Sequence, residues 1–287
     1  MIINEEFSLC NDTNVPKLGL GTWLIDDARA TGVVRQAVAA GYRHVDTAQA
    51  YGNERGIGEG IRSCGIAREK LFVTSKIAAE AKSYAAAAKA IDDILATMGL
   101  DHLDLVLIHS PQPWAEFRDP SRRYYRENVQ TWHALEDAYA SGKVRAIGVS
   151  NFLEDDLDNL LENCIVRPMV DQVLCHVGNT PSDLIGFCQR QRIQVEAYSP
   201  IAHGTVLANP SIKAIADRYH VSVAQLCIRY VLQLGCVALP KTTDPDHLRS
   251  DTQVDFVISN RDMDALSAVS DARDYGEFSA FPVFSGR

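Results

Sequence analysis

The sequence contains no long apolar run and no cluster of basic residues. No segment reaches the roughly 20 apolar residues of a membrane-spanning helix, and the opening MIINEEFSLC lacks the basic start and apolar stretch of a signal peptide. We therefore expect a cytoplasmic protein that does not associate with membranes. The formal net charge of −9, without a basic patch, argues against nucleic acid as a partner.

Cysteine and histidine spacings typical of structural sites are also missing. The seven cysteines form no C-x-x-C pair and are irregularly spaced, so we expect reduced, mostly buried thiols and no disulfide framework. The eight histidines show neither H-x-H nor H-E-x-x-H spacing. A metal site of the hydrolase type is therefore not expected.

Strand-like and helix-like segments alternate along the chain. Its 287 residues, 46% hydrophobic and 23% charged, have an ordinary globular composition and can bury a large core. Short apolar strands are predicted at 18–22, 43–46, 71–76, 103–109, 144–150, 169–172, 194–199 and 237–241. Helical patterns separate them at 26–41, 53–65, 83–99, 122–141, 153–163, 181–191 and 222–234.

Eight such units predict an α/β fold, a (β/α)8 TIM barrel in which 1–287 form a single domain. The alternative, a doubly wound open sheet, is disfavoured because no strand runs into G-x-G-x-x-G. Residues 6–17 predict a hairpin over the barrel floor. The long connections 110–121 and 199–211 follow strand ends, and the aromatic tail from 274 is expected to fold over the barrel mouth.

Polar residues stand at or just after the ends of seven predicted strands. Any one of them alone would mark only an exit to solvent. In a barrel these ends converge on one face, so seven of them in register predict a polar pocket. The residues are Asp46, Lys76, His109, Ser150, Asn151, Gln172, Tyr198 and Lys241.

The chemistry of these residue types favours proton transfer to a carbonyl. A Lys76–Asp46 ion pair beside Tyr51, in the loop after the second strand, is expected to lower the pKa of the phenol from about 10. Such a phenol donates a proton to a developing alkoxide, and His109 can orient the same oxygen. None of these groups donates hydride, so reduction requires a cofactor.

The segment GYRHVDTAQAYGNERGIG at 41–58 resembles the first signature of the aldo-keto reductase family. The resemblance continues through LDLVLIHSP (103–111), GVSN (148–151), AYSP (197–200) and LPKTT (239–243). It is most similar to the bacterial branch that includes 2,5-diketo-gluconate reductases. The resemblance implies a barrel that binds NADPH across its C-terminal face without a Rossmann domain.

The resemblance also implies a role for each matching residue. Tyr51 would be the general acid, with Lys76 paired to Asp46 and with His109 orienting the carbonyl. Further cofactor contacts are expected from Thr22, Trp23, Ser150, Asn151, Gln172, Tyr198, Ser199, Ile201, Lys241, Thr242, His247 and Asp251. Of these, Ser150, Asn151 and Gln172 would hold the carboxamide, Tyr198 would stack on the nicotinamide, and Lys241 and Thr242 would contact the 2′-phosphate. The expected substrate contacts are Trp23, Tyr51, His109 and Trp114.

The chain departs from the family pattern at the adenosine end. His247 stands where many members have an arginine that pairs with the 2′-phosphate, and Arg249 lies two residues further on. Histidine is mostly neutral at pH 7, so a permanent positive charge is lost. We expect NADPH because Lys241 and Thr242 remain, with NADH as the alternative cofactor.

The substrate pocket departs from the pattern as well. Ala78 and Ser110 occupy positions where many relatives have a tryptophan and another bulky aromatic residue. We expect a wider pocket that accepts bulky ketones. The remaining wall would come from Trp23, Trp114, Phe278, Phe281 and Phe284.

Two other functions fit parts of the pattern. A Schiff-base aldolase would use Lys76 as its nucleophile, and a non-catalytic nicotinamide-nucleotide sensor would use the same fold. The order of Asp46, Tyr51, Lys76 and His109 favours reduction of a small-molecule carbonyl. Family resemblance also implies a monomer.

Overall fold

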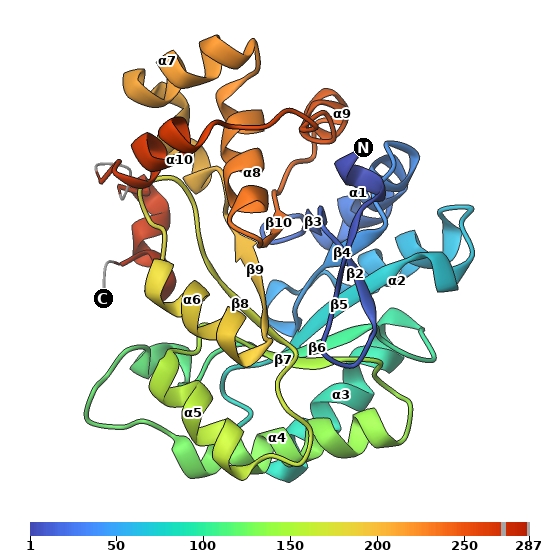
Figure 1. Ribbon diagram of the computed structural model, residues 1–287. Helices are drawn as coiled ribbons and strands as arrows, with labels where there is room; N and C mark the ends of the chain where they lie inside the picture. Colours follow the sequence, from blue (N-terminus) through green and yellow to red (C-terminus); the bar gives the residue numbers. More distant parts are fainter. Residues whose placement is uncertain (271–273, 286–287) are drawn as a thin grey trace.

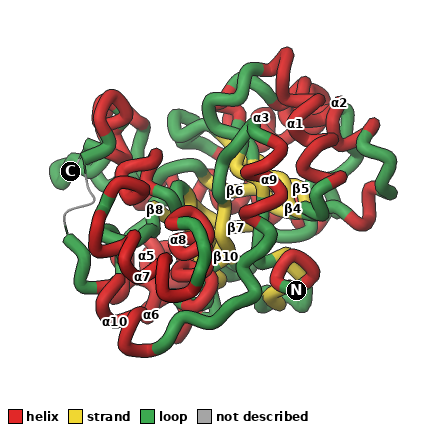
Figure 2. Tube along the Cα trace, turned by 90° about the horizontal axis from the view of Figure 1, so that it is seen from above, coloured by secondary structure: helices red, strands yellow, loops and turns green. Residues whose placement is uncertain are grey.

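The computed structural model describes residues 1–270 and 274–285, which fold around a ring of eight parallel strands. Figure 1 shows the strands at the centre of the molecule, and Figure 2 shows them from above, surrounded by helices. The ring strands are β3 (Leu20–Gly21), β4 (His44–Asp46), β5 (Phe72–Ile77), β6 (Leu105–Ile108), β7 (Ile147–Ser150), β8 (Val170–Leu174), β9 (Gln194–Tyr198) and β10 (Val237–Leu239).

The ring follows the order β10-β9-β8-β7-β6-β5-β4-β3, with every neighbouring pair parallel. A parallel bridge between Leu18 and Ala238 joins the two ends of this order. Two hydrogen bonds support it, from Gly19 N to Ala238 O and from Gly21 N to Pro240 O, both 2.9 Å. The predicted (β/α)8 barrel is confirmed, and the open sheet is wrong.

Seven helices correspond to the predicted helical patterns: α1 (Asp27–Ala39), α2 (Glu54–Ser63), α3 (Tyr84–Met98), α4 (Tyr125–Ala140), α5 (Glu154–Asn163), α6 (Ser182–Gln191) and α8 (Val223–Gln233). The sequence interpretation missed three further helices: α7 (Pro210–Tyr219), α9 (Pro245–Asp251) and α10 (Asn260–Ser267). All three carry start signals: Asn209 caps α7 and Asp244 caps α9, each before a proline at the first helical position, and Ser259 caps α10.

The predicted N-terminal hairpin is confirmed. Strands β1 (Glu6–Ser8) and β2 (Asn14–Pro16) pair antiparallel. At their turn, Asn11 Nδ2 donates a hydrogen bond of 3.0 Å to the carbonyl of Arg145, which lies two residues before the start of β7. The hairpin therefore lies at the N-terminal end of the barrel, opposite the end that carries the polar residues.

The glycines of α2 allow close helix packing. A Cβ atom at Gly56 would overlap the Asp27 carbonyl, and one at Gly58 would overlap the Met98 carbonyl at the end of α3. A Cβ at Gly60 would come within 2.6 Å of the Val34 side chain. The absence of side chains at these positions lets α2 pack directly on α1 and α3. This packing fixes the short 3-10 turn at Gln49–Tyr51, which leads into α2.

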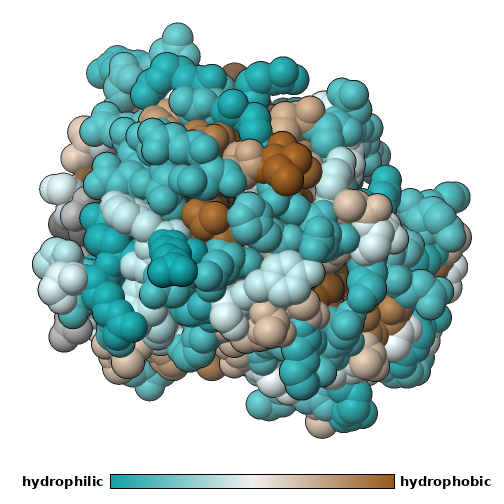
Figure 3. Space-filling model, turned by 90° about the horizontal axis from the view of Figure 1, so that it is seen from below, coloured by the Kyte–Doolittle hydropathy of each residue, from teal (hydrophilic) through white to brown (hydrophobic). Residues whose placement is uncertain are grey.

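One face of the molecule is largely polar. The face shown in Figure 3 is mostly hydrophilic, with separate apolar spots. Within the described residues, no helix is both long enough and apolar enough to cross a membrane. All seven cysteines are free, four of them buried and three partly buried, as predicted for reduced thiols.

Candidate active site

The C-terminal ends of the barrel strands open into a pocket of about 1010 Å³. This volume lies at the upper end of the range found for pockets that bind small molecules. Every residue predicted to belong to the site lines the pocket, with the exception of Lys76, which lies beneath its floor and is fully buried. The structure thus brings together residues from β4, β6, β7, β8, β9 and the segment after β10.

Lys76 and Asp46 form a buried ion pair below the pocket. The Lys76 ammonium lies 2.6 Å from Asp46 Oδ1 and 2.7 Å from Oδ2, and it also donates to the Thr47 carbonyl at 3.0 Å. These contacts occupy all three of its donor hydrogens. Burial of both partners requires such complete pairing, because an isolated charge here would be costly.

Tyr51 lies above this pair. Its ring centroid is 5.2 Å from Lys76 Nζ, and no described residue forms a hydrogen bond with its hydroxyl, which faces the pocket. Burial raises the pKa of Tyr51 well above 10, and the Asp46 carboxylate raises it further. The expected lowering by Lys76 is therefore wrong for this structure, because burial of the phenol dominates and the Asp46 carboxylate acts in the same direction.

His109 is a neutral imidazole at pH 7. Burial lowers its pKa well below 6.5, and the Lys76 charge adds to this effect. Its Nδ1 atom is buried without a hydrogen-bond partner among the described residues, so Nε2 is the nitrogen that can reach a ligand. The ring lies between Tyr51 and Trp114, with centroid distances of 5.7 and 5.0 Å.

Polar side chains on β7 to β9 form a connected group beside His109. Ser150 Oγ donates to the Gln172 carbonyl (2.8 Å), and Asn151 Nδ2 donates to the His109 carbonyl (3.0 Å). The Tyr198 hydroxyl donates to Asn151 Oδ1 at 2.7 Å. Asn151 has a φ of 63°, a left-handed conformation that asparagine tolerates better than most residues.

Gln172 connects the ion pair to an acid that the sequence interpretation missed. Its amide nitrogen donates to Asp46 Oδ2 and to Glu196 Oε2, both at 2.8 Å. The donor end of the amide is thereby occupied, which leaves its carbonyl oxygen to accept a hydrogen bond in the pocket. The signal for Glu196 was strand alternation, since it precedes Tyr198 by two residues on the same face of β9.

The end of the pocket that Lys241 lines carries little positive charge. Lys241 is exposed at the rim, and partial desolvation together with the nearby Arg29 charge lowers its pKa. Arg249 is paired with Asp246 and does not line the pocket. Burial raises the pKa of Asp251 to about 6, an effect that His247 partly offsets. Lys241 is therefore the main cation at this end.

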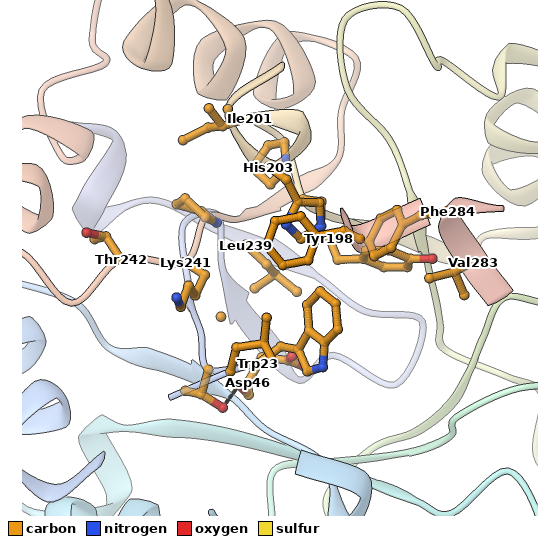
Figure 4. Close-up of a pocket in the computed structure, with 18 of the residues that line it drawn as sticks. Trp23, Asp46, Tyr198, Ile201, His203, Leu239, Lys241, Thr242, Val283 and Phe284 are labelled. Atoms are coloured by element: carbon orange, nitrogen blue, oxygen red, sulfur yellow. Dashed lines mark hydrogen bonds between the residues drawn. The ribbon is translucent and has the colours of Figure 1, made fainter. Parts of the chain in front are cut away.

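Aromatic side chains cover the other end of the pocket, and the C-terminal tail supplies several of them, as predicted. Figure 4 shows Lys241 and Thr242 on one side, Val283 and Phe284 on the other, and Tyr198 between them. Trp23 packs against Phe281 with ring centroids 4.8 Å apart. Trp114, Phe278, Phe281 and Phe284 also line this end.

His203, which the sequence interpretation missed, stacks on the tail ring of Phe278 at 4.4 Å. It lies in the connection after β9 and is a sixth residue of the aromatic wall. The two positions without bulky side chains, Ala78 and Ser110, do not line the pocket. These two residues are therefore not in direct contact with the pocket that they were expected to widen.

A half-buried lysine, also missed from the sequence, holds the segment after His109. Lys82 Nζ donates to the Ser110 carbonyl at 2.7 Å and to Asn128 Oδ1 at 2.9 Å. Asn128 in turn donates to the Pro111 carbonyl at 2.9 Å. The two side chains fix residues 110 and 111 against α4 and thereby fix the backbone next to His109.

Comparison with known proteins gives a consistent result. Residues 17–271 match the model of the Aldo/keto reductase family. The chain is 39% identical to the glyoxal reductase of Bacillus subtilis, covering 93% of this chain and 94% of the relative. It is 37% identical to the 9,11-endoperoxide prostaglandin H2 reductase of Trypanosoma cruzi, covering 94% and 93%.

Solved structures agree in fold. An aldo/keto reductase from Brucella melitensis superposes with a TM-score of 0.85 at 34% identity, covering 92% of this chain and 99% of the other. An aldo-keto reductase from Bombyx mori in complex with NADP gives a TM-score of 0.85 at 28% identity, covering 96% of each chain.

Replacing Lys82 by methionine is expected to change how stability depends on pH. Burial lowers the Lys82 pKa to about 7, whereas an unfolded lysine has a pKa of about 10.4. Between these values the unfolded chain binds more protons, so this lysine makes the folded protein more stable as pH rises. In urea denaturation from pH 7 to 9.5, the free energy of unfolding of the wild type should rise relative to that of Lys82→Met by up to about 1.4 kcal/mol per pH unit.

Lys89→Met is the matched control for this experiment. Lys89 is exposed on α3, where it pairs with Asp93, and its replacement should give a stability difference that does not change with pH. A constant difference between wild type and Lys82→Met over the same range would contradict the assignment of Lys82 as a half-buried amine with a lowered pKa.

Proposed function

Because the chain belongs to the aldo/keto reductase family, we propose that it reduces aldehydes and ketones to alcohols with NADPH. This proposal rests on the set of polar side chains that gather at one place in the pocket. Tyr51 offers a free hydroxyl and His109 a free Nε2, and both lie above the buried Lys76–Asp46 pair. These are the groups needed to bind and protonate a carbonyl oxygen.

The pocket has features that fit a nicotinamide dinucleotide. The free carbonyl oxygen of Gln172 can accept a hydrogen bond from a carboxamide, and the Tyr198 ring offers a stacking surface. Lys241 and Thr242 line the distant end, where a phosphate would be bound. When bound, the dinucleotide supplies the hydride, which no side chain of the site can supply.

Tyr51 holds the proton that completes the reduction. Its raised pKa keeps the hydroxyl protonated at neutral pH, and it still donates readily because an alkoxide is a stronger base than a phenolate. Neutral His109 contributes a hydrogen bond to the substrate oxygen without adding charge. The phenolate that would remain lies close to the Lys76 ammonium, whose charge Asp46 compensates.

The two alternative functions receive less support. In an aldolase, Lys76 would have to attack a carbonyl, but all three of its donor hydrogens are in use and it does not line the pocket. A nucleotide sensor would not need a free phenol and a free imidazole side by side. No observation on this chain favours either function over reduction.

The substrate class follows from the wall of the pocket. Beyond the Tyr51 hydroxyl, the wall is formed by Trp23, Trp114 and the tail phenylalanines, with no cation among them. We propose uncharged carbonyl compounds with apolar substituents, bulky ketones included. We also propose that residues 1–287 form one catalytic domain and that the protein works as a monomer in the cytoplasm.

Tyr51→Phe tests the proton donor. The variant should lose about 10²- to 10⁴-fold in kcat, because it lacks the donated proton, while its NADPH dissociation constant should stay within about twofold, since the hydroxyl contacts no expected cofactor group. Loss of nicotinamide absorbance with an aromatic aldehyde measures the rate, and tryptophan fluorescence measures binding. Tyr84→Phe, which removes an exposed hydroxyl on α3, is the control. An unchanged rate in Tyr51→Phe would refute the mechanism.

His247→Arg tests cofactor choice. An arginine at this position adds a permanent charge near the expected 2′-phosphate, and the ratio of kcat/KM for NADPH to that for NADH should rise about tenfold, equal to ~1.4 kcal/mol. Initial rates with both cofactors measure the ratio. His133→Arg, on α4 beside Glu136, should leave the ratio unchanged. A ratio that does not respond to His247→Arg would show that no phosphate binds there.

A further inference from the structure

Glu196 is a buried acid that the proposed reaction does not use. It lies on β9 two residues before Tyr198, so its side chain points into the barrel below the pocket. The residue is fully buried. In the ring of strands, Glu196 pairs with Gln172 of β8 on one side and with Val237 of β10 on the other.

Its contacts place Glu196 in the same network as the ion pair. Oε2 accepts from Gln172 Nε2 at 2.8 Å, and the same nitrogen donates to Asp46 Oδ2 at 2.8 Å. The network therefore runs from Lys76 through Asp46 and Gln172 to Glu196, across the interior of the barrel. The other oxygen, Oε1, has no hydrogen-bond partner among the described residues.

An acid in these surroundings stays protonated at neutral pH. A buried carboxylate with one unpaired oxygen is far more costly than a buried neutral carboxyl group. Burial, assisted by the Asp46 charge, raises the pKa of Glu196 to about 8, and the Gln172 hydrogen bond and the Lys76 charge only partly oppose this shift. Ionisation consequently falls within the pH range in which an enzyme can be assayed.

The charge on Glu196 decides the net charge beneath the pocket. The charged groups that act on it are Asp46 of β4 and Lys76 of β5, whose charges cancel. Gln172 of β8 is neutral, and β10 contributes only Val237, Ala238 and Leu239. The floor is therefore neutral while Glu196 is protonated and carries one negative charge after it ionises.

We propose that protonated Glu196 keeps the pocket floor neutral. A neutral floor makes the pocket bind reduced nicotinamide in preference to oxidised nicotinamide. The inference rests on the proposed function, that the pocket binds NADPH. Reduced nicotinamide is a neutral ring, and the oxidised ring is a cation. A negative charge below the ring stabilises the cation, so ionisation of Glu196 shifts the preference toward NADP+.

The ratio of two dissociation constants isolates this effect. NADPH and NADP+ share the adenosine half, so titration of the 2′-phosphate, Asp251 or Lys241 affects both equally and cancels in the ratio. Binding is followed by tryptophan fluorescence, since Trp23 and Trp114 line the pocket. Titrations from pH 6 to 9.5 in wild type should show Kd(NADP+)/Kd(NADPH) falling by about three- to thirtyfold, with a midpoint near pH 8.

Two variants test the assignment to Glu196. Glu196→Gln keeps an acceptor for Gln172 but cannot ionise, so its ratio should not change with pH and should equal the wild-type value at pH 6. If Glu196→Gln does not fold, Glu196→Leu takes its place, and its ratio should likewise not change with pH. Asp171→Asn is the matched control, because Asp171 is equally buried on β8 with a raised pKa but alternates to the face opposite Gln172. It should retain the wild-type slope.

Each outcome has one meaning. A wild-type ratio that does not change with pH, or the same slope in Glu196→Gln, overturns the inference. Loss of the slope in Asp171→Asn overturns it as well, because the effect would then not depend on the Gln172 connection. Failure of the wild type to bind either nucleotide contradicts the proposed function, and is thereby distinguished from a failure of this inference.

Discussion

The buried pair between Lys76 and Asp46 is the interaction on which the rest of the site depends. Two charges inside a barrel are tolerated only when their hydrogen-bonding capacity is nearly exhausted. Here the ammonium uses two carboxylate oxygens and the Thr47 carbonyl, and Asp46 accepts in addition from Gln172. The orientation of Gln172, and with it the oxygen it presents to the pocket, follows from this pairing.

Burial, acting together with this pair, keeps Tyr51 and His109 neutral. Compensated by Asp46, Lys76 does not make Tyr51 an acidic phenol, and burial instead keeps the proton on its hydroxyl. His109 loses its proton in the same surroundings. A neutral donor and a neutral hydrogen-bonding partner, above a floor without net charge, suit the proposed reaction, in which negative charge develops on the substrate oxygen as hydride is transferred.

The barrel and the main site residues could be predicted because both depend on local patterns. Strand ends such as Asp46, Lys76 and His109 are visible as the last polar residue of an apolar run, and the barrel then brings them together. Lys82 and Glu196 could not be assigned in this way, since their roles arise from contacts with Ser110 and Gln172 that only the folded chain creates. The Tyr51 pKa was misjudged because its direction depends on burial as well as on the nearest charge.

A double-mutant cycle on the buried pair tests this account most directly. The free energies of unfolding in urea are measured for wild type, Lys76→Met, Asp46→Asn and the double variant. We predict that each single change costs about 3–5 kcal/mol, because it leaves one uncompensated buried charge, and that the double variant loses at least about 2 kcal/mol less than the sum. Costs that add within about 0.5 kcal/mol would contradict the claim that the two charges stabilise each other.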